Sequence, residues 1–544
     1  MASLLLLPPS IRNVSIFASR AAPRLKLRFS TTTANIAERR TYAEAIKLLD
    51  SLQSNRAIVS SISSTPSDMN LTAIPEMLEW TRKAGYAPKD LAAPGLKYIH
   101  VAGTKGKGSV SVMIENILLQ YWRKREPEKT QLGRIGLYTS PHLIHVRERI
   151  RIDGSPISEA LFARYFFELW DRFALAADGH SSETKPNYFR YLTLLAFHTF
   201  IQEGVGTAVV ECGIGGEYDS TNILPREAVT ACAITSLGID HRSMLGETIE
   251  EIAWHKAGIM KTGVPAFSVK QLPAAQIVLV KRAIEKETNL AVVERLPVLE
   301  EAKLGLEGDF QKDNASLAVA VAASHLKALG IADIPTSTTL PVEFTTGLES
   351  VTWPGRCQYI QDGNTEWMID GAHTLESLTA TASWFRSKCH EAWASRKPPT
   401  ATMLIFNQQD RDAQHLLSHL LSEFRSAANA GNFRGLPPKI MSPLGRAFTF
   451  AAFCTNRPFK VPEGSEEFVD LRVQNQLAKI YPRFDRGNQL LMTYASAEEA
   501  VDLAYKVSEG EERVLVLVTG SLHLAGAVLQ VLESRGKDVT GKEA

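Results

Sequence analysis

The sequence has few cysteines, and none of them forms a recognisable metal or redox motif. The chain includes no CxxC and no cysteine–histidine spacing typical of a zinc site. Its 544 residues are enough to bury large cores without disulfides or structural metals. We therefore predict buried thiols in a reducing compartment and no structural metal site. The cysteines are Cys212, Cys232, Cys357, Cys389 and Cys454.

Long apolar runs and a strong net charge are also missing. No apolar run approaches the roughly 18–20 residues that a membrane-spanning helix needs, so we predict no transmembrane segment. The formal net charge is only +1. A field this weak excludes general electrostatic attraction to nucleic acid or to an anionic membrane, and we expect no nucleic-acid partner.

Acidic residues are absent from residues 1–37, which are rich in Arg and Ser. This segment has five basic side chains, so the remaining chain holds 55 Lys and Arg against 59 Asp and Glu, or about −4. The composition is typical of a mitochondrial transit peptide, and it predicts import into the mitochondrion, into the matrix or onto the inner membrane. The alternative is a disordered tail without a targeting role. The basic residues are Arg12, Arg20, Arg24, Lys26 and Arg28.

From residue 38 onward, apolar strands alternate with amphipathic helices, which predicts parallel βαβ units and a doubly wound α/β sheet. Proline and glycine interrupt this pattern at 331–355, where we expect no regular element. We predict a first domain at 38–340, a second, smaller domain at 350–535 and a flexible tail at 536–544. The expected helices are 38–52, 71–84, 109–122, 159–173, 187–202, 247–259 and 311–329. The expected strands are 96–101, 135–138, 207–211, 229–236, 366–369, 402–406 and 514–518.

A glycine-rich run at 103–109 joins the strand at 96–101 to the helix at 109–122, as a phosphate-binding loop requires. The run is Gly103, Thr104, Lys105, Gly106, Lys107, Gly108 and Ser109. Its glycines let backbone N–H groups face a phosphate at a helix N-terminus. Lys107 then reaches the β- and γ-phosphates, and Ser109 offers a hydroxyl to Mg²⁺. Gly108 stands where a hydroxyl residue normally follows the lysine, and the alternative is a glycine-rich turn with surface lysines.

Polar side chains follow other predicted strands where ligands of open α/β sheets bind. Glu211 ends one strand, and Asp240 and His241 follow the next, so a carboxylate and an imidazole are available for Mg²⁺ and substrate. Taken singly, Glu211 could cap a helix and His241 could lie in an ordinary turn. Similar loops follow the later strands, where an ordinary polar loop is the equal alternative. These are 370–373, 407–412 and 519–521, with Arg356 at the interdomain joint.

The helix at 247–259 places Lys256 on its apolar face, with Ile249, Ile252 and Ala253 at helical spacing. A lysine in that position usually extends its ammonium to water. If instead it is desolvated, its pKa falls and its amine becomes a nucleophile that can capture carbon dioxide as a carbamate.

These motifs, in this order, resemble those of the folylpolyglutamate synthases of the Mur ligase superfamily, of the eukaryotic mitochondrial and cytosolic type, over about residues 40–530. The resemblance implies an ATPase domain followed by a smaller Rossmann-like domain. The further motifs that carry it are 138–143, 211–222, 255–259 and 353–356. Two positions depart from the pattern. Thr374 stands where many bacterial relatives have Asn, and the loop 407–412 lacks a glycine before Asp-Arg-Asp.

The resemblance implies a ligase that uses ATP and Mg²⁺, together with a monovalent cation such as K⁺, to add L-glutamate to the γ-carboxylate of folate. It implies a monomer found in the mitochondrion and the cytoplasm, with a carbamylated Lys256 and a catalytic role for Lys107 and His373. The implied ATP-binding residues are Gly103–Ser109, Asn314, Arg356 and Asp370. The implied metal ligands are Ser109, Ser140, Glu211 and His241, and the glutamate site includes His373 and Ser521.

Three alternatives stay open. The nearest is a dihydrofolate synthase, or a bifunctional enzyme that accepts both dihydropteroate and folates. A P-loop switch or motor would leave Lys256 and the 370–373 motif without a role, and a pure binding module would leave a Mg²⁺-ready phosphate loop unused.

Overall fold

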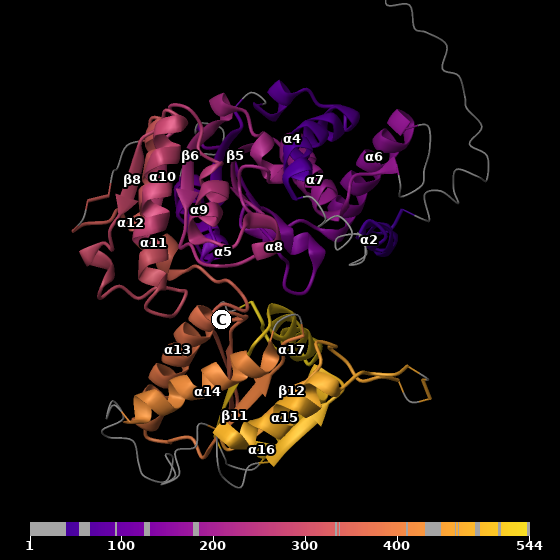
Figure 1. Ribbon diagram of the computed structural model, residues 1–544, viewed down its shortest axis with the longest axis vertical. Helices are drawn as coiled ribbons and strands as arrows, with labels where there is room; N and C mark the ends of the chain where they lie inside the picture. The colour runs from indigo at the N-terminus through magenta and orange to yellow at the C-terminus, as the bar shows by residue number, and fades with distance from the viewer. Residues whose placement is uncertain are drawn as a thin grey trace, which may run out of the picture.

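The computed structural model describes residues 40–53, 66–92, 95–124, 131–177, 184–331, 335–336, 338–409, 412–429, 448–462, 464–465, 467–484, 490–509 and 513–540. The chain forms two sheets, each covered by helices on both faces (Figure 1). The eight-stranded sheet belongs to the indigo-to-salmon part of Figure 1, and the six-stranded sheet to the orange-to-yellow part. The predicted transit segment lies outside the described residues.

The first sheet has the strand order β4-β3-β2-β5-β1-β6-β7-β8. Strands β2, β5, β1, β6, β7 and β8 are parallel, and β3 and β4 extend one edge as an antiparallel hairpin. The strands are β1 (Lys97–Ala102), β2 (Arg134–Tyr138), β3 (Ile150–Ile152), β4 (Ser155–Pro156), β5 (Val205–Glu211), β6 (Val229–Ile234), β7 (Ala266–Val269) and β8 (Leu290–Val293). The central β1 is almost wholly buried, as a parallel strand with helices on both faces should be.

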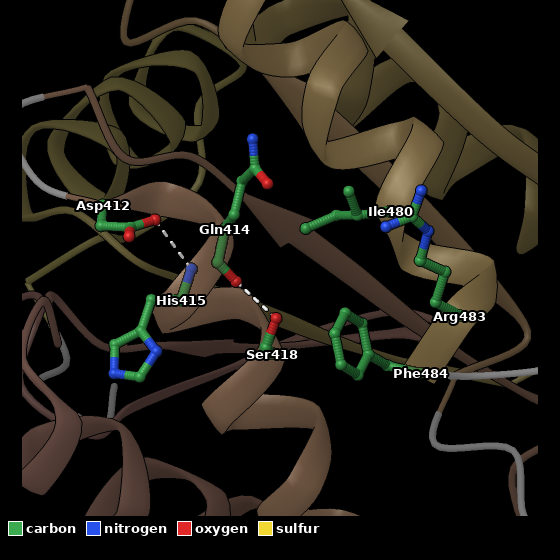
Figure 2. Close-up of a pocket in the computed structure, with 7 residues that line it drawn as sticks. All are labelled: Asp412, Gln414, His415, Ser418, Ile480, Arg483 and Phe484. Atoms are coloured by element: carbon green, nitrogen blue, oxygen red, sulfur yellow. Dashed lines mark hydrogen bonds between the residues drawn. The ribbon is translucent and has the colours of Figure 1, made fainter.

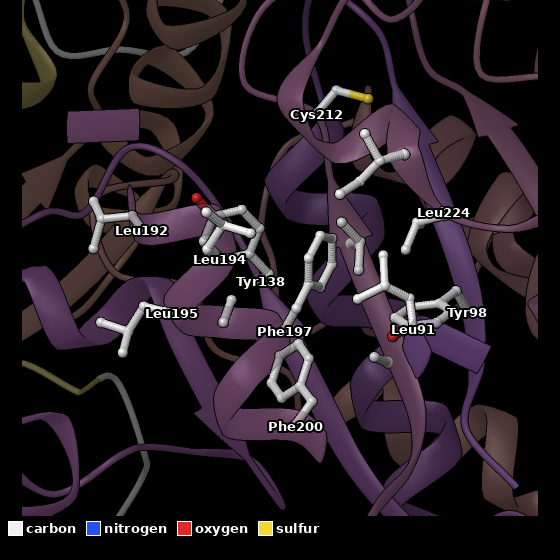
Figure 3. Close-up of a cluster of buried hydrophobic side chains, with 14 of the residues drawn as sticks. Leu91, Tyr98, Tyr138, Leu192, Leu194, Leu195, Phe197, Phe200, Cys212 and Leu224 are labelled. Carbon is white, nitrogen blue, oxygen red and sulfur yellow. The ribbon is translucent and has the colours of Figure 1, made fainter. Parts of the chain in front are cut away.

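Two hydrophobic cores lie on opposite faces of this sheet. One is formed with α2 (Tyr42–Asp50), α4 (Pro66–Lys83), α6 (Glu159–Ala177), α7 (Tyr188–Gln202), α9 (Ile249–Ala257) and α10 (Pro273–Glu285). The other is formed with α5 (Lys107–Lys124), α11 (Gln311–Ala328) and α12 (Val342–Glu349). Figure 3 shows aromatic rings of the first core, with Phe197 and Phe200 of α7 beside Tyr98 of β1 and Tyr138 of β2. Side chains of β1 are buried in both cores, so the position of β1 is set by packing on both faces, and with it the start of the loop that follows.

The second sheet has the order β13-β12-β11-β14-β10-β9, with only β9 antiparallel. Its strands are β9 (Gln358–Asp362), β10 (Thr365–Ile369), β11 (Ala401–Phe406), β12 (Phe450–Cys454), β13 (Leu490–Tyr494) and β14 (Val514–Thr519). Its helices are α13 (Leu375–Trp393), α14 (Ala413–Asn429), α15 (Arg472–Phe484), α16 (Ala497–Val507) and α17 (Leu522–Ser534). The predicted doubly wound class is therefore confirmed for both sheets.

The prediction that 331–355 holds no regular element is wrong, because α12 (Val342–Glu349) forms there. Pro341 precedes this helix at its N-cap, where a missing N–H costs nothing. Gly347 lies inside the helix because a β-carbon there would come within 2.8 Å of the Cα of Ile117 in α5. The sequence pattern suggested Gly347 as a helix breaker, but the residue allows α12 and α5 to pack closely.

All five cysteines are buried and free, as predicted. In the described part of the chain, no helix is both long enough and apolar enough to cross a bilayer.

Candidate active site

The loop between β1 and α5 is built around glycines at positions where a side chain would be strained. Gly103 has φ +149°, and an added β-carbon would lie 1.8 Å from Oγ1 of Thr235. Gly106 has φ +88°, and its β-carbon would lie 2.5 Å from Oδ1 of Asn314. Both positions therefore combine a backbone conformation that favours glycine with a close neighbour.

The end of β6 holds this loop in place. The backbone N–H groups of Thr104 and Lys105 both donate to the carbonyl of Ser236, at 2.9 and 3.0 Å. The Thr235 hydroxyl donates to the carbonyl of Lys105 at 2.6 Å. Because these two N–H groups already have partners, the donors left for a phosphate are those at the start of α5, where N–H groups have no partner within the helix.

Two lysines from different elements meet at one carbonyl oxygen. The Nζ atoms of Lys107 and Lys256 both donate to the carbonyl of Gly103, at 3.1 and 2.7 Å. Lys105 lies on the same loop, with its Nζ 3.5 Å from Oδ2 of Asp240. The loop thus collects three lysine amines where the phosphates of a nucleotide would add negative charge.

Lys256 is buried, with only 2% of its surface exposed. Burial and, to a smaller extent, the nearby charge of Lys107 together lower the pKa of its amine to about 7. Its helix α9 begins with a capping box between Thr248 and Glu251, and its inner face also buries Ile252. The lysine therefore points into the site and does not extend to water.

Glu211 ends β5 beside the same loop. Its Oε2 accepts a hydrogen bond from the backbone N–H of Ser140 at 3.1 Å. Burial raises the pKa of this carboxyl, while the positive charges of Lys107 and Arg356 oppose the rise. Arg356 comes from beyond the first sheet, so its charge reaches Glu211 from the interdomain joint.

Ser109, on the first turn of α5, is held by α11. The side chain of Gln311 donates to the Ser109 hydroxyl at 3.4 Å, and Asn314 donates to Gln311 at 2.8 Å. All three side chains are buried. Asn314 therefore faces the phosphate loop from the opposite helix, against the backbone of Gly106.

His241 is the predicted site residue with the most open position. It is exposed, has φ +51° and precedes α8 (Arg242–Leu245). Its backbone N–H donates to the carboxylate of Asp240 at 2.9 Å. In the described part of the chain, no three His, Cys, Asp or Glu residues lie close enough together to hold a metal by themselves.

The donors near the loop nevertheless fit Mg²⁺, which prefers a few protein oxygens and keeps water and phosphate oxygens as its other ligands. Ser109 offers a hydroxyl, and Glu211 offers a carboxylate whose burial would be compensated by a nearby cation. Three His, Cys, Asp or Glu ligands are not needed for such a site.

Asp370, His373 and Ser521 lie at the ends of β10 and β14. Asp370 accepts from the backbone N–H of Cys357 (2.8 Å) and Ala372 (3.0 Å) and from the Thr381 hydroxyl (2.8 Å). The ring Nδ1 of His373 lies 2.8 Å from the carbonyl of Gly371. Ser521 caps α17 through the N–H of His523.

Leu143 and Ile144 contact the second domain, and these two contacts were not predicted from the sequence. The loop after β2 is held by Glu148, whose carboxylate accepts from the backbone N–H groups of Leu143 (2.8 Å), Ile144 (3.2 Å) and His145 (2.7 Å). Leu143 and Ile144 then pack against the core of the second sheet. The sequence signal available was the capping spacing of His145 and Glu148 before a short helical turn.

The Asn407–Asp412 loop is only partly described, since residues 410 and 411 lie outside the described residues. Asn407 is buried and bonded to Gln474 and Asn456. Asp412 lines a pocket of about 330 Å³ between α14 and α15 (Figure 2). The other residues of this pocket are Gln414, His415, Ser418, Ile480, Arg483 and Phe484, none of which was predicted as a site residue.

Comparison with known proteins gives consistent matches along nearly the whole chain. No family model matches it. A folylpolyglutamate synthase of Saccharomyces cerevisiae (strain FostersO) is 42% identical over 515 residues, which cover 91% of this chain and 87% of that protein. The folylpolyglutamate synthase of strain S288c gives the same identity and coverage.

Solved structures share the fold. Mycobacterium tuberculosis folylpolyglutamate synthase complexed with ADP matches with a TM-score of 0.64 at 24% identity, covering 90% of this chain and 98% of that one. The apo form of the L. casei enzyme matches with a TM-score of 0.61 at 22% identity, covering 91% and 100%. E. coli FolC in complex with DHPP and ADP matches with a TM-score of 0.58 at 21% identity, covering 87% and 99%.

Proposed function

The chain belongs to the folylpolyglutamate synthase family of ligases, and we propose that it joins L-glutamate to the γ-carboxylate of a reduced folate at the expense of ATP. The observation that carries this proposal is the convergence of Lys107 and the buried Lys256 on the carbonyl of Gly103, beside Glu211. A phosphate switch needs the loop and its lysine. It has no use for a second, desolvated lysine on a separate helix.

The proposed reaction begins with phosphoryl transfer, because a carboxylate does not react directly with an amine. The γ-carboxylate oxygen attacks the γ-phosphorus of ATP, the bond to the β-phosphate oxygen breaks, and an acyl phosphate and ADP form. The amine of glutamate then adds to the acyl carbon, loses a proton, and expels inorganic phosphate to leave an amide. The protein mainly positions the groups and neutralises charge in such a transfer.

Within this proposal the start of α5 holds the phosphates and Lys107 reaches the transferred one. Asn314, Arg356 and Asp370 face the nucleotide from the other side. Ser109, Ser140, Glu211 and His241 would hold Mg²⁺, which when bound neutralises phosphate charge, and a monovalent cation such as K⁺ is proposed beside it. His373 and Ser521 hold the incoming glutamate at the ends of β10 and β14.

We propose that Lys256 is carbamylated. Its Nζ forms a bond to the carbon of carbon dioxide and releases a proton, so that a cation becomes an anion next to the phosphate loop. The pKa of about 7 supports this step, because the neutral amine is then abundant near neutral pH. We also propose, as the sequence resemblance implies, a monomer located in both the mitochondrion and the cytoplasm.

The test measures ADP release from purified protein with ATP, Mg²⁺, L-glutamate and either tetrahydrofolate or dihydropteroate. We expect ADP release with tetrahydrofolate only when glutamate is also present, and a product one glutamate longer by mass spectrometry. ADP release that needs neither folate nor glutamate would identify a switch or motor instead. Release with dihydropteroate as well would identify the bifunctional enzyme.

A further inference from the structure

A carboxylate outside the candidate active site joins the two parts of the molecule. Glu307 lies in the loop before α11, and its two oxygens have different partners, both on α13. Oε2 accepts a hydrogen bond from the indole Nε1 of Trp384 at 2.7 Å, and Oε1 accepts one from Nζ of Lys388 at 2.6 Å. In Figure 1, α13 is the helix of the orange-to-yellow part that lies below α11 and α12. We name this contact, formed by Glu307, Trp384 and Lys388, the Glu307 clasp.

The loop that carries Glu307 is held firmly on its own side. Leu306 is buried in the core of the first sheet, and the N–H of Gly305 donates to the carbonyl of Leu348 at 2.9 Å. A β-carbon at Gly305 would lie 2.2 Å from the carbonyl oxygen of Val351, so the loop lies directly against the chain that crosses to the second sheet. Glu307 therefore has a fixed backbone beside the covalent connection.

The same loop leads directly to the phosphate site. The carbonyl of Gly308 accepts from the N–H of Gln311, which begins α11. Gln311 contacts Ser109, and Asn314 lies against Gly106. A displacement of Glu307 would thus be transmitted to the helix that supports the phosphate loop.

On the other side, one face of α13 contacts both the Glu307 clasp and the site residues Asp370 and His373. Residues 377, 381, 384 and 388 follow helical spacing and share that face. The Thr381 hydroxyl donates to Oδ1 of Asp370 at 2.8 Å, and Ser377 Oγ accepts from the N–H of His373 at 3.2 Å. Trp384 is 5% exposed, so the face is packed.

We propose that Glu307 is a positioning residue that holds α13, and with it Asp370 and His373, in register with the phosphate loop. This inference rests on the proposed function, in which those two residues meet substrates bound to the other part. The chain crosses between the two parts near 351–356, and a connection at one place allows rotation. The Glu307 clasp beside that crossing, made by two donors to one carboxylate, opposes the rotation together with the packing of Leu143 against α17. The acyl phosphate and the glutamate amine must meet within about 3–3.5 Å, so a small rotation reduces the rate.

The experiment compares Glu307→Gln, Lys388→Gln and the double variant, with Trp384→Phe as a variant that keeps the ring and removes the donor. The matched control is Glu391→Gln, which removes a different carboxylate 3.6 Å from Lys388, on α13 itself and 63% exposed. For each protein, kcat and KM for glutamate and for ATP are measured, together with the melting temperature. Gln at 307 keeps an acceptor oxygen for one of the two donors, so we expect Glu307→Gln to fold, and the melting temperatures check that the other variants fold.

We expect Glu307→Gln to lower kcat/KM for glutamate by about ten-fold, with KM for ATP changed less than two-fold and the melting temperature changed by less than about 2 °C. The kcat/KM of the double variant should fall no further than that of either single variant, because both substitutions remove the same contact between Glu307 and Lys388. Glu391→Gln should behave as the wild type.

Equal kcat/KM values in Glu307→Gln and Glu391→Gln would overturn the proposal. A double variant whose fold-loss in kcat/KM equals the product of the losses in Glu307→Gln and Lys388→Gln would overturn it too. A fall in melting temperature with unchanged kcat/KM would show a purely structural role and also overturn it. The wild type in the same assay separates the two proposals. An inactive wild type refutes the proposed function, whereas an active wild type with unaffected variants refutes only the clasp.

Discussion

At the scale of single residues, the site depends on side chains whose environment differs from water. Lys256 is the strongest case, because its amine is buried, bonded to Gly103 and close to Lys107. Glu211 is its counterpart, a buried carboxyl whose pKa is raised by burial and which has cations on two sides. Perturbed groups of opposite kind beside one loop are typical of a catalytic site.

Replacing Lys256 with alanine should lower ligation by about a hundred-fold, because it removes the charge proposed next to the phosphates. Acetate or formate at high concentration should restore part of the activity by filling the space with an anion. Steady-state ADP release with and without the anion measures both effects. Full activity of the alanine variant would refute the role of Lys256, and loss without rescue would show that Lys256 is essential but leave the carbamate without support.

The pKa of Lys256 also predicts how stability depends on pH. Its value is about 7 in the folded protein against 10.5 ordinarily. Below about pH 7 both states hold the proton, and burying the charge destabilises the fold in full. Between about 7 and 10.5 the unfolded chain keeps a proton that the folded protein releases, so the free energy of unfolding rises with pH.

Urea denaturation in CO₂-free buffer checks this. The stability of the wild type relative to Lys256→Met should increase across that range and level off above it. A constant difference between the two proteins would contradict the lowered pKa.

At the scale of elements, function depends on close approaches between helices and loops from different sheets. Gly526 in α17 is the clearest example, since an added β-carbon would lie 2.2 Å from the carbonyl oxygen of Leu143. Leu143 belongs to the loop that Glu148 holds and that carries Ser140. The helix and the loop that carries Ser140 are therefore packed against each other with no spare room.

We expect Gly526→Ala to lower kcat/KM by about ten-fold, because the methyl group pushes the Ser140 loop away from Glu211. This happens although alanine ordinarily favours a helix over glycine by about 1 kcal/mol. Gln530→Ala, a half-buried position on the same helix, is the control. Kinetics and thermal melting measure the result. A Gly526→Ala protein that is more stable and fully active would show that the contact is dispensable.

At the scale of the whole molecule, two helix-covered sheets are joined by one chain crossing near 351–356, by the Glu307 clasp and by the contact of Leu143 with α17. Residues of the candidate site lie at the strand ends of both sheets. Residues at the strand ends of both sheets can therefore act on one reaction only while the two parts stay aligned.

The first 37 residues are expected to direct the protein without taking part in catalysis. The first described helix is α2, which begins at Tyr42. Deleting residues 1–37 should leave the purified protein with full activity and abolish import into isolated mitochondria. A protease-protection import assay with the full chain as control measures this. Import of the truncated protein would show that the targeting signal lies elsewhere.

Much of this architecture was predictable because local patterns are sufficient for it. The alternation of apolar strands and amphipathic helices predicted the doubly wound sheets. Helical spacing placed Lys256 on an inward face, where the structure buries it. The strands β3, β4, β7, β8, β9, β12 and β13 were missed, because strands of two to five residues at or near sheet edges leave little periodic signal.

The sequence by itself determined the chemistry available to this protein, since glycine, lysine and carboxylate follow strands in an order that one family shares. Only the tertiary structure decided which of those groups meet. Lys256 and Gly103 are 153 positions apart, and Glu307 lies 77 and 81 positions from its two partners. No local pattern encodes such contacts, because they depend on how elements far apart in the sequence pack together, and packing joins residues by distance in space.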